Sequence, residues 1–363
     1  MRTIEGERER GRESLQLPEI RTANGISINV YRPSVEITNE DIEGWKVETA
    51  HGNLLTAASI VDKLGIERRY VETEDRFYIA GQAAYGVLLE KPSEERQLDA
   101  IFVTTSFPEA IPLSQRLNEH LKHLRIDAPF TRDVHAACSG FVRSLADIKD
   151  HEEEFMGKRV LIVTAEKYSD DVFDLRKDGY NADPALSQTI FSDGGTGMDF
   201  VYGEDLRVLA VRSGPLLDRL SGAIKMPIDY SVIEPNQHRI VEKVPVSESG
   251  KIEQNGKVVY GSVLRYIPNL IREIVEEAGL TPDDIDLVIP HQGSGRMVLG
   301  LEEILTEYKG KVVLDIEEGN FSSGSIPKAM AKAQQEGRMK KGQNIVVAGF
   351  GAGLYASVAV IRT

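Results

Sequence analysis

The sequence of 363 residues contains one cysteine, Cys138, and one tryptophan, Trp45. A single cysteine excludes an internal disulfide and a cysteine-rich metal site, so Cys138 can act only as a lone thiol. No apolar run approaches the ~20 residues that a membrane-spanning helix needs. The opening MRTIEGERERGRESLQ also has no apolar core of the kind found in a secretory signal. These absences predict a cytoplasmic protein without a membrane segment.

The chain also lacks the positive charge that binding to nucleic acid requires. Its formal net charge is −14, whereas neutralising phosphates takes clustered Lys and Arg. Hydrophobic residues make up 41% and charged residues 28%, values typical of a globular protein. Residues 1–20 are dense in charge of both signs and poor in apolar residues, so we expect a solvated extension there.

Several runs rich in β-branched residues alternate with patterns typical of helices. Strands are predicted at DAIFVTTS (99–106), KRVLIVTAE (158–166), DLVIPH (286–291) and NIVVAGFG (344–351). Their nearly continuous apolar character indicates strands that are buried on both faces. The sequence therefore predicts an α/β protein in which helices cover the sheets.

Two stretches of the chain follow the same plan. In each, a strand that begins at an aspartate, Asp99 or Asp286, is followed by a polar turn, a helix, a glycine and a second strand. This repetition predicts an internal duplication, with halves at 21–205 and 206–363. Residues 213–257 fit either a long excursion over a substrate entrance or a loop without function.

Cys138 lies in AACSGF, between a predicted strand and the start of a predicted helix. Such turns place side chains at the carboxyl edge of a sheet, where ligands bind in open α/β folds. A helix N-terminus also favours the thiolate, which is the reactive form of cysteine. The alternative is an inert buried cysteine, which is common for a lone thiol.

Two further polar residues occupy similar places in the second half. His291 ends a strand before the glycine-rich turn QGSGR, and Asn320 lies in GNFSSGS at a strand-to-helix turn. Either could be structural, since asparagine at such a turn often caps a helix. A duplicated fold brings equivalent strand ends together, however, so Cys138 would meet both residues at one crevice. A thiol beside two neutral hydrogen-bond donors suits acyl transfer followed by stabilisation of an enolate.

Two other kinds of site are disfavoured. The glycine-rich segments SDGGTG and GFGAG lack the full dinucleotide-binding pattern of strand, G-x-G-x-x-G, helix and distal acid. The seven histidines and the many carboxylates show no compact metal-ligand spacing. We therefore expect neither a bound nicotinamide cofactor nor a metal.

The motifs AACSGF, PHQ with its downstream arginine, and GNFSSGSIP resemble those of the β-ketoacyl-acyl carrier protein synthase III family of the thiolase superfamily. The resemblance runs from about Ile26 to Ile361 and includes GIERR (65–69), FSDGGTG (191–197) and GFGAGL (349–354). It implies a thiolase fold, in which duplicated βαβαβαββ halves form an αβαβα layered sandwich.

The resemblance also implies roles for individual residues. Cys138 would be the acylated nucleophile, while His291 and Asn320 would bind a malonyl thioester and stabilise its enolate. The backbone amides of Cys138 and Ala352 would form an oxyanion hole. Arg296 would help to dock an acidic acyl carrier protein. Family members work as homodimers, and a residue of the SFPEAI loop (106–111) would approach the partner subunit's acyl pocket.

The expected reaction is a decarboxylating condensation. An acyl-CoA or acyl-carrier thioester loads Cys138, and malonyl-carrier protein then gives a 3-oxoacyl thioester; CoA and phosphopantetheine thioesters are substrates, and no cofactor stays bound. The turn HQGSGR and the absence of a tryptophan before GIERR depart from the usual pattern. They leave open a polyketide-type or acyl-transferring relative that acts on CoA thioesters or a non-malonyl nucleophile. A non-catalytic partner of acyl carriers is a third possibility, which the three retained polar residues disfavour.

A cluster of basic residues near the C-terminus offers a second place for an acidic carrier to dock. It comprises Lys328, Lys332, Arg338, Lys340 and Lys341. Opposite charges steer association between such partners. The alternative is a solvated helix face, which we favour for Lys340 and Lys341.

Overall fold

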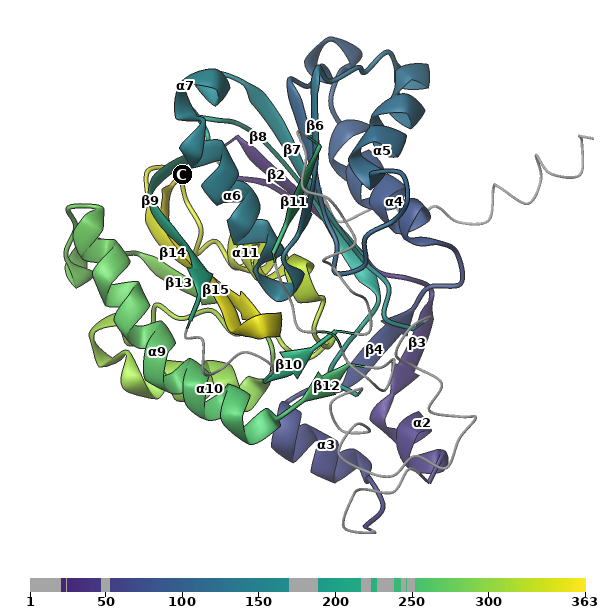
Figure 1. Cartoon of the computed structure of the whole chain (residues 1–363), viewed down its shortest axis with the longest axis vertical. Helices are drawn as coiled ribbons and strands as arrows, with labels where there is room; N and C mark the ends of the chain where they lie inside the picture. Colours follow the sequence, from purple (N-terminus) through teal and green to yellow (C-terminus); the bar gives the residue numbers. More distant parts are fainter. Residues whose placement is uncertain are drawn as a thin grey trace, which may run out of the picture.

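The structure is a computed structural model that describes residues 21–23, 25–46, 53–169, 189–216, 223–226, 238–242, 246 and 252–363. The extension predicted for residues 1–20 lies outside the described residues, as does most of 213–257. Two β-sheets form the framework of the described chain. Both sheets and the helices around them appear in Figure 1.

The larger sheet has seven strands in the order β1-β2-β8-β7-β5-β6-β11. Strands β7, β5, β6 and β11 run parallel to one another, whereas β1, β2 and β8 pair antiparallel with their neighbours. In the order given, the strands span Arg21–Ala23, Ile26–Tyr31, Gly194–Val201, Arg159–Glu166, Ala100–Thr104, Phe130–His135 and Arg239–Val241.

The smaller sheet repeats the plan of the larger one. Its order is β13-β14-β15-β9, in which β13 and β14 are parallel and the other pairs antiparallel. Val312 forms an isolated parallel β-bridge to Val288, on the edge of β13 that does not pair with β14. In the larger sheet, β6 pairs with β5 on the corresponding edge. The sequence β2-β8-β7-β5 of one sheet thus corresponds to β9-β15-β14-β13 of the other, as expected for a duplication. These four strands span Leu287–Pro290 (β13), Asn344–Gly351 (β14), Tyr355–Arg362 (β15) and Arg207–Pro215 (β9).

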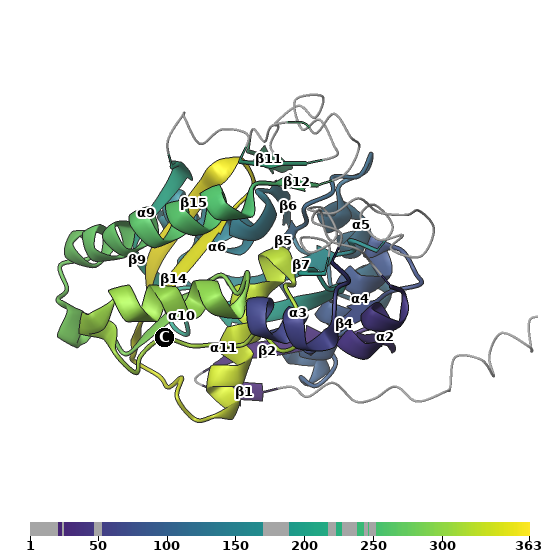
Figure 2. The ribbon, with the colours of Figure 1, turned by 90° about the horizontal axis from the view of Figure 1, so that it is seen from below.

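Helices form three layers around the two sheets (Figures 1 and 2). Helices α4 and α5 cover the outer face of the larger sheet, and α9 and α10 lie on the outer side of the smaller one. Helices α6 and α11 lie between the sheets and contact strands of both. This αβαβα arrangement is the layered thiolase fold that the sequence predicted. The six helices span Arg76–Leu88 (α4), Leu113–Leu121 (α5), Gly140–Asp150 (α6), Gly256–Glu277 (α9), Gly295–Ile304 (α10) and Ser325–Gln335 (α11).

Shorter elements lie beside the sheets. Strands β3 (Val35–Thr38) and β4 (Arg68–Val71) form an antiparallel pair, and β10 (Ile224–Lys225) pairs with β12 (Glu253–Gln254). In the described ranges, the remaining α-helices are α2 (Asn39–Gly44), α3 (Ala57–Leu64) and α7 (Glu152–Phe155).

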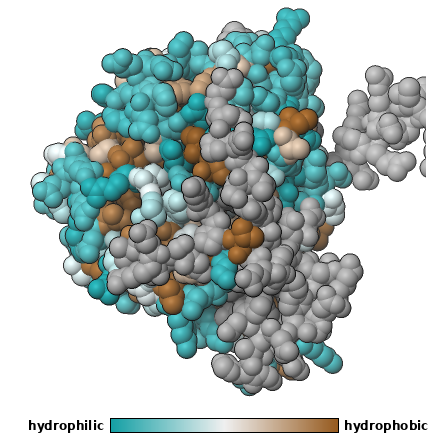
Figure 3. All heavy atoms as spheres, in the orientation of Figure 1, coloured by the Kyte–Doolittle hydropathy of each residue, from teal (hydrophilic) through white to brown (hydrophobic). Residues whose placement is uncertain are grey.

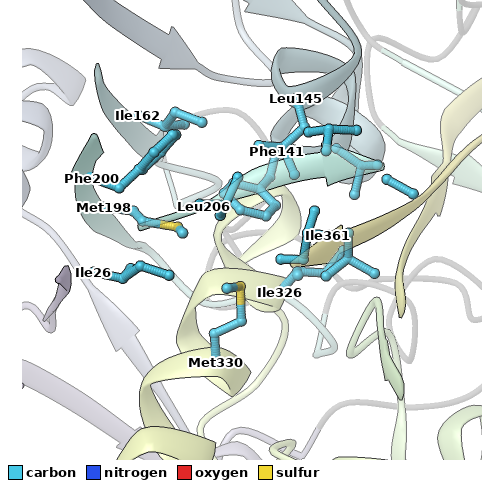
Figure 4. Packing of buried hydrophobic residues seen from close by; sticks show 14 of the residues in the cluster. Ile26, Phe141, Leu145, Ile162, Met198, Phe200, Leu206, Ile326, Met330 and Ile361 are labelled. Carbon is cyan, nitrogen blue, oxygen red and sulfur yellow. The ribbon is translucent and has the colours of Figure 1, made fainter. Parts of the chain in front are cut away.

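The central helices hold the two halves together through a single apolar core (Figure 4). Phe141 and Leu145 of α6 and Met330 of α11 are fully buried in it, as their helical spacing requires. They meet Phe200 of the larger sheet and Ile361 of the smaller one, so neither sheet has a separate inner core. The surface visible in Figure 3 is largely hydrophilic over the described residues, and no described helix is long and apolar enough to cross a membrane.

The predicted strands agree closely with β5, β7, β13 and β14, and the predicted helices with α6 and α11. Strand β8 ends at Val201 in the larger sheet and β9 begins at Arg207 in the smaller, so the chain passes from one sheet to the other between them. The boundary between 21–205 and 206–363 stays a prediction. Strand β11 follows this boundary in sequence and still pairs with β6 of the larger sheet.

The packing of α4 on the larger sheet gives a test of this fold. A β-carbon at Gly197 of β8 would lie 2.2 Å from the carbonyl oxygen of Ala83. Because this oxygen belongs to the helix backbone, α4 would have to move away from β8 to make room. We expect Gly197→Ala to lower the free energy of unfolding by ~1–3 kcal/mol through overpacking. Urea denaturation would measure the change.

Gly81 of α4 provides the matched control, because a β-carbon there meets no atom within 4 Å. Gly81→Ala should raise stability by ~0.5–1 kcal/mol, since glycine is a poor helix former. Equal stabilities of the two variants would contradict the close approach of α4 to β8.

Candidate active site

The three residues predicted for chemistry line one cavity between the halves of the chain. Cys138, His291 and Asn320 all face it, and Ala352 borders it as well. Its apolar wall includes Phe191, Met226, Ile252 and Leu354. Lys63, Tyr260 and Arg296 also line it and retain exposure to solvent. The cavity therefore joins a polar end, an apolar wall and a charged opening.

Cys138 lies in a short 3-10 turn, Ala137–Ser139, between the end of β6 and the start of α6. The backbone of β14 packs directly on this turn. A β-carbon at Gly351 would lie 2.9 Å from the Cβ atom of Cys138, and one at Gly349 would lie 2.9 Å from the Cα atom of Ser139. Glycine is needed at both positions for this close approach. The GFGAG motif thus holds the turn that carries Cys138 in place and brings Ala352 to the same cavity.

Cys138 is only 9% exposed, and its burial is the main influence on the acidity of the thiol. Burial raises the pKa of Cys138 to about 12, and the charge of Glu166 contributes in the same direction. A hydrogen bond from the Ser322 hydroxyl, 3.4 Å from Sγ, opposes the rise in the pKa. The thiolate expected from the nearby helix N-terminus is therefore not the resting form, because desolvation outweighs the favourable contacts.

His291 and Asn320 lie side by side at the polar end of the cavity. The Nδ2 atom of Asn320 is 3.4 Å from Nε2 of His291. The backbone N–H of Ser322 donates to Oδ1 of Asn320 at 2.6 Å, which turns the amide nitrogen toward the histidine. This network fixes the orientation of the asparagine side chain.

The imidazole of His291 is held by Ser325, whose Oγ lies 2.6 Å from Nδ1. Burial lowers the pKa of His291 to about 3, so the ring is neutral near pH 7. When Ser325 donates to Nδ1, the proton of the neutral ring is on Nε2. Two N–H donors, one from His291 and one from Asn320, then point toward the same part of the cavity. This pair can bind an oxygen atom that becomes negatively charged.

Two basic residues predicted to dock a carrier protein have different surroundings. Arg296 is partly exposed, and its guanidinium pairs with Asp62 of α3 at 2.9 Å. Lys328, which the sequence placed in a basic docking cluster, is only 2% exposed. Its ammonium bonds Asp315 at 2.8 Å and lies 3.5 Å from Glu318. The docking prediction is wrong for Lys328, because a buried and paired ammonium cannot meet a partner.

Sequence reasoning missed the residues that support the three predicted ones. Ser322 contacts both Asn320 and Cys138, Ser325 orients His291, and Glu166 and Tyr168 lie behind the thiol. The serines could have been suspected from their spacing after Asn320. In the described part of the chain, no group of three or more His, Cys, Asp or Glu residues could hold a metal ion.

Comparisons with known proteins agree with this geometry. Residues 132–212, which include Cys138, match the family model described as 3-oxoacyl-(acyl-carrier-protein) synthase III. Residues 275–363, which include His291 and Asn320, match the C-terminal model of the same family. The two models thus divide the three cavity residues as the two halves of the fold do.

Individual relatives span nearly the whole chain. The β-ketoacyl-(acyl-carrier-protein) synthase III of Aquifex aeolicus is 29% identical over 339 residues, which are 93% of this chain and 98% of the relative. The crystal structure of the 3-oxoacyl-(acyl-carrier-protein) synthase III from Aquifex aeolicus has a TM-score of 0.73 at 28% identity, covering 95% of this chain and 100% of that one.

A third similar structure is the priming β-ketosynthase of the R1128 polyketide pathway. It has a TM-score of 0.71 at 26% identity and covers 96% of this chain and 98% of its own. Fold, cavity and relatives all lead to the same assignment. The chain belongs to the β-ketoacyl-ACP synthase III family of acyltransferases with the thiolase-like fold.

Proposed function

We propose that the protein transfers an acyl group to Cys138 and condenses it with a malonyl thioester to give a 3-oxoacyl thioester and carbon dioxide. The observation that carries this proposal is the single cavity in which a thiol faces a neutral imidazole and a carboxamide, whose nitrogen atoms lie 3.4 Å apart. The thiol provides the covalent step, and the donors provide stabilisation for a carbanion. Neither step requires a cofactor that stays bound.

In the first step, the sulfur of Cys138 attacks the carbonyl carbon of the acyl donor. The carbonyl oxygen becomes negative, and the amides of Cys138 and Ala352 stabilise it. The bond to the donor's sulfur then breaks, and this thiolate leaves with a proton from solvent. The apolar wall, which includes Phe191, Met226 and Ile252, suits the hydrocarbon part of the acyl group.

In the second step, the malonyl thioester enters with its carbonyl oxygen between His291 and Asn320. Loss of carbon dioxide leaves an enolate, whose oxygen accepts hydrogen bonds from both residues. The carbanion attacks the acyl carbon on Cys138, and the cysteine sulfur leaves as a thiolate. The neutral state of His291 suits this role, because an N–H donor is needed rather than a proton acceptor.

The partners follow from the opening of the cavity. Lys63 can meet the phosphate of CoA or of a phosphopantetheine arm, whereas Arg296 can meet an acidic acyl carrier protein. We also propose a cytoplasmic homodimer. Ile111 of the SFPEAI loop, 60% exposed, is the apolar residue of that loop available to a partner subunit.

A polyketide-type or acyl-transferring enzyme with the same covalent step is the second candidate. Similarity to the priming ketosynthase of a polyketide pathway favours it. So does the turn HQGSGR, where a β-carbon added at Gly293 would lie 3.4 Å from the His291 ring. This turn thus leaves extra room beside the histidine for a different nucleophile.

The covalent step is tested by intact mass. After incubation with a panel of acyl-CoA and acyl-carrier thioesters, the purified protein should gain the mass of one acyl group. Cys138→Ala and the nearly isosteric Cys138→Ser should show no gain. A gain that persists in both variants, or no gain with any donor, would contradict the proposed nucleophile.

The roles of His291 and Asn320 are tested by separating the two steps. We expect His291→Ala and Asn320→Ala to keep acylation of Cys138 while release of carbon dioxide from a malonyl thioester falls ~10²–10³-fold, as for loss of an oxyanion donor. His151→Ala, at a partly exposed histidine outside the cavity, is the control. Unchanged decarboxylation in both cavity variants would assign the enolate site elsewhere.

The role of Arg296 separates the two candidate functions. Arg296→Glu should raise KM for carrier-bound substrate and leave KM for the corresponding CoA thioester nearly unchanged. Lys340→Glu makes the same change of charge at an exposed lysine away from the cavity and should alter neither. An equal loss with both substrates would favour the second candidate, in which carrier docking is not required.

A further inference from the structure

A buried carboxylate beside the cavity has no part in the steps described so far. Glu166 ends β7 and is fully buried. Two serines satisfy it: Ser106 donates from its backbone N–H at 3.0 Å and from its hydroxyl at 3.2 Å, and Ser323 donates from its hydroxyl at 2.6 Å and from its backbone N–H at 3.3 Å. None of the described ion pairs includes Glu166. Burying a carboxylate without a cationic partner costs free energy, so we expect Glu166 to have a function that offsets this cost.

A row of hydroxyl groups connects this carboxylate to the thiol. The Oγ atom of Ser106 is 3.2 Å from Oε1 of Glu166 and 3.0 Å from Oγ of Ser322. The Oγ atom of Ser322 is in turn 3.4 Å from Sγ of Cys138. Each hydroxyl can donate in one direction and accept from the other by rotating about its C–O bond. The row therefore forms an unbroken path for a proton.

The reaction of Cys138 needs such a path. With a pKa of about 12, the thiol is protonated at neutral pH, and the sulfur must lose its proton to become a good nucleophile. His291 is poorly suited to take this proton, because its pKa is about 3 and its Nδ1 is occupied by Ser325. Among the described groups, Glu166 is the carboxylate that hydroxyl groups link to the sulfur.

We propose that Glu166 takes up the proton of Cys138 through Ser322 and Ser106 during acylation, and returns it by the same path after condensation. The proposal rests on the acylation of Cys138 under the proposed function. In this scheme, Glu166 acts through the serines and touches no substrate.

The protons balance over both steps. In acylation, the S–H bond of Cys138 breaks, a C–S bond forms, and each hydroxyl passes one proton along until Glu166 is a carboxylic acid. The donor's thiolate leaves and is protonated by solvent. In condensation, the C–S bond to Cys138 breaks and the thiolate regains the proton that Glu166 held. The acylated intermediate is thus accompanied by a neutral carboxyl group.

The surroundings suit a group that gains and loses a proton. Burial raises the pKa of Glu166 to about 7, while its hydrogen bonds from Ser323 and Ser106 oppose the rise. The ionisable groups around Glu166 are Cys138, Lys167, Tyr168 and Asp193. Lys167 and Tyr168 follow Glu166 in the chain, and the Tyr168 hydroxyl lies 2.8 Å from Oγ of Ser106. Asp193 accepts a hydrogen bond from the backbone N–H of Tyr168.

The sign of the pH dependence follows from these groups. Only the carboxylate form of Glu166 can accept a proton, and this form predominates above its pKa. The acylation rate should therefore rise as the pH increases through about 7 and then level off. A purely structural Glu166 would give no such inflection.

The test compares single-turnover acylation, read by rapid quenching and intact mass, from pH 5.5 to 9. We expect Glu166→Gln, which keeps the size of the side chain, to slow acylation ~100-fold and to lose the inflection, as for removal of a general base. Ser106→Ala should have the same effect with Glu166 in place. Ser323→Ala is the matched control, because its hydroxyl bonds the same Oε1 atom and lies outside the path. Above the inflection its rate should stay within ~3-fold of wild type. The inflection should be kept but moved to higher pH, because a hydrogen bond that opposes the rise in the pKa of Glu166 is lost.

Alkylation of Cys138 by iodoacetamide over the same pH range serves as a second readout that needs no acyl donor. It should show the same inflection and the same order of variants, and thermal unfolding would verify that each variant is folded. If Glu166→Gln does not fold, Ser106→Ala carries the test. Wild-type rates and inflection in either of these two variants, or an equal loss in Ser323→Ala, would overturn the relay. Failure of wild type to be acylated, with the alkylation profile intact, would instead contradict the proposed function.

Discussion

Burial of the Cys138 thiol is the constraint on which the rest of the site depends. The close approach of β14, made possible by Gly349 and Gly351, removes the thiol from solvent. Removal from water raises the pKa of the thiol, so the site must supply groups that handle its proton. Exclusion of water also strengthens every hydrogen bond that faces the cavity. Strong hydrogen bonds are needed to stabilise an oxyanion or an enolate.

The duplicated fold builds this site from two equivalent turns. One turn begins at Ala137 and holds Cys138, and the other begins at Ser322 and follows Asn320. Both first residues have positive φ values, 43° for Ala137 and 49° for Ser322, although neither is glycine. Strain of this kind costs ~1–3 kcal/mol per residue and persists where the surrounding structure determines it, often at functional sites. The central helices α6 and α11, which start directly after these turns, share one core and so fix the two turns relative to each other.

Much of this arrangement could be predicted from the sequence, because it depends on local patterns. The strands β5, β7, β13 and β14 are continuous apolar runs. Cys138 and Asn320 were predicted at strand-to-helix turns, and His291 at the end of a strand. The serine path could not be predicted, since Ser106, Ser322 and Glu166 come from distant segments and serine is common at any turn. Lys328 was wrongly assigned to an exposed docking cluster for a related reason. Its partners Asp315 and Glu318 belong to a loop whose position only the tertiary structure determines.

The central claim is that one cavity holds the acyl group on Cys138 and the enolate site of His291 and Asn320 together. A crystal structure of the protein trapped with an acyl group tests it most directly. The account predicts continuous density from Sγ of Cys138 into the space beside Phe191, Met226 and Ile252, with the acyl oxygen ~2.7–3.1 Å from the amides of Cys138 and Ala352. His291 and Asn320 should remain free to bind a second thioester. An acyl group bound at another residue, or one whose oxygen occupies the space between His291 and Asn320, would contradict it.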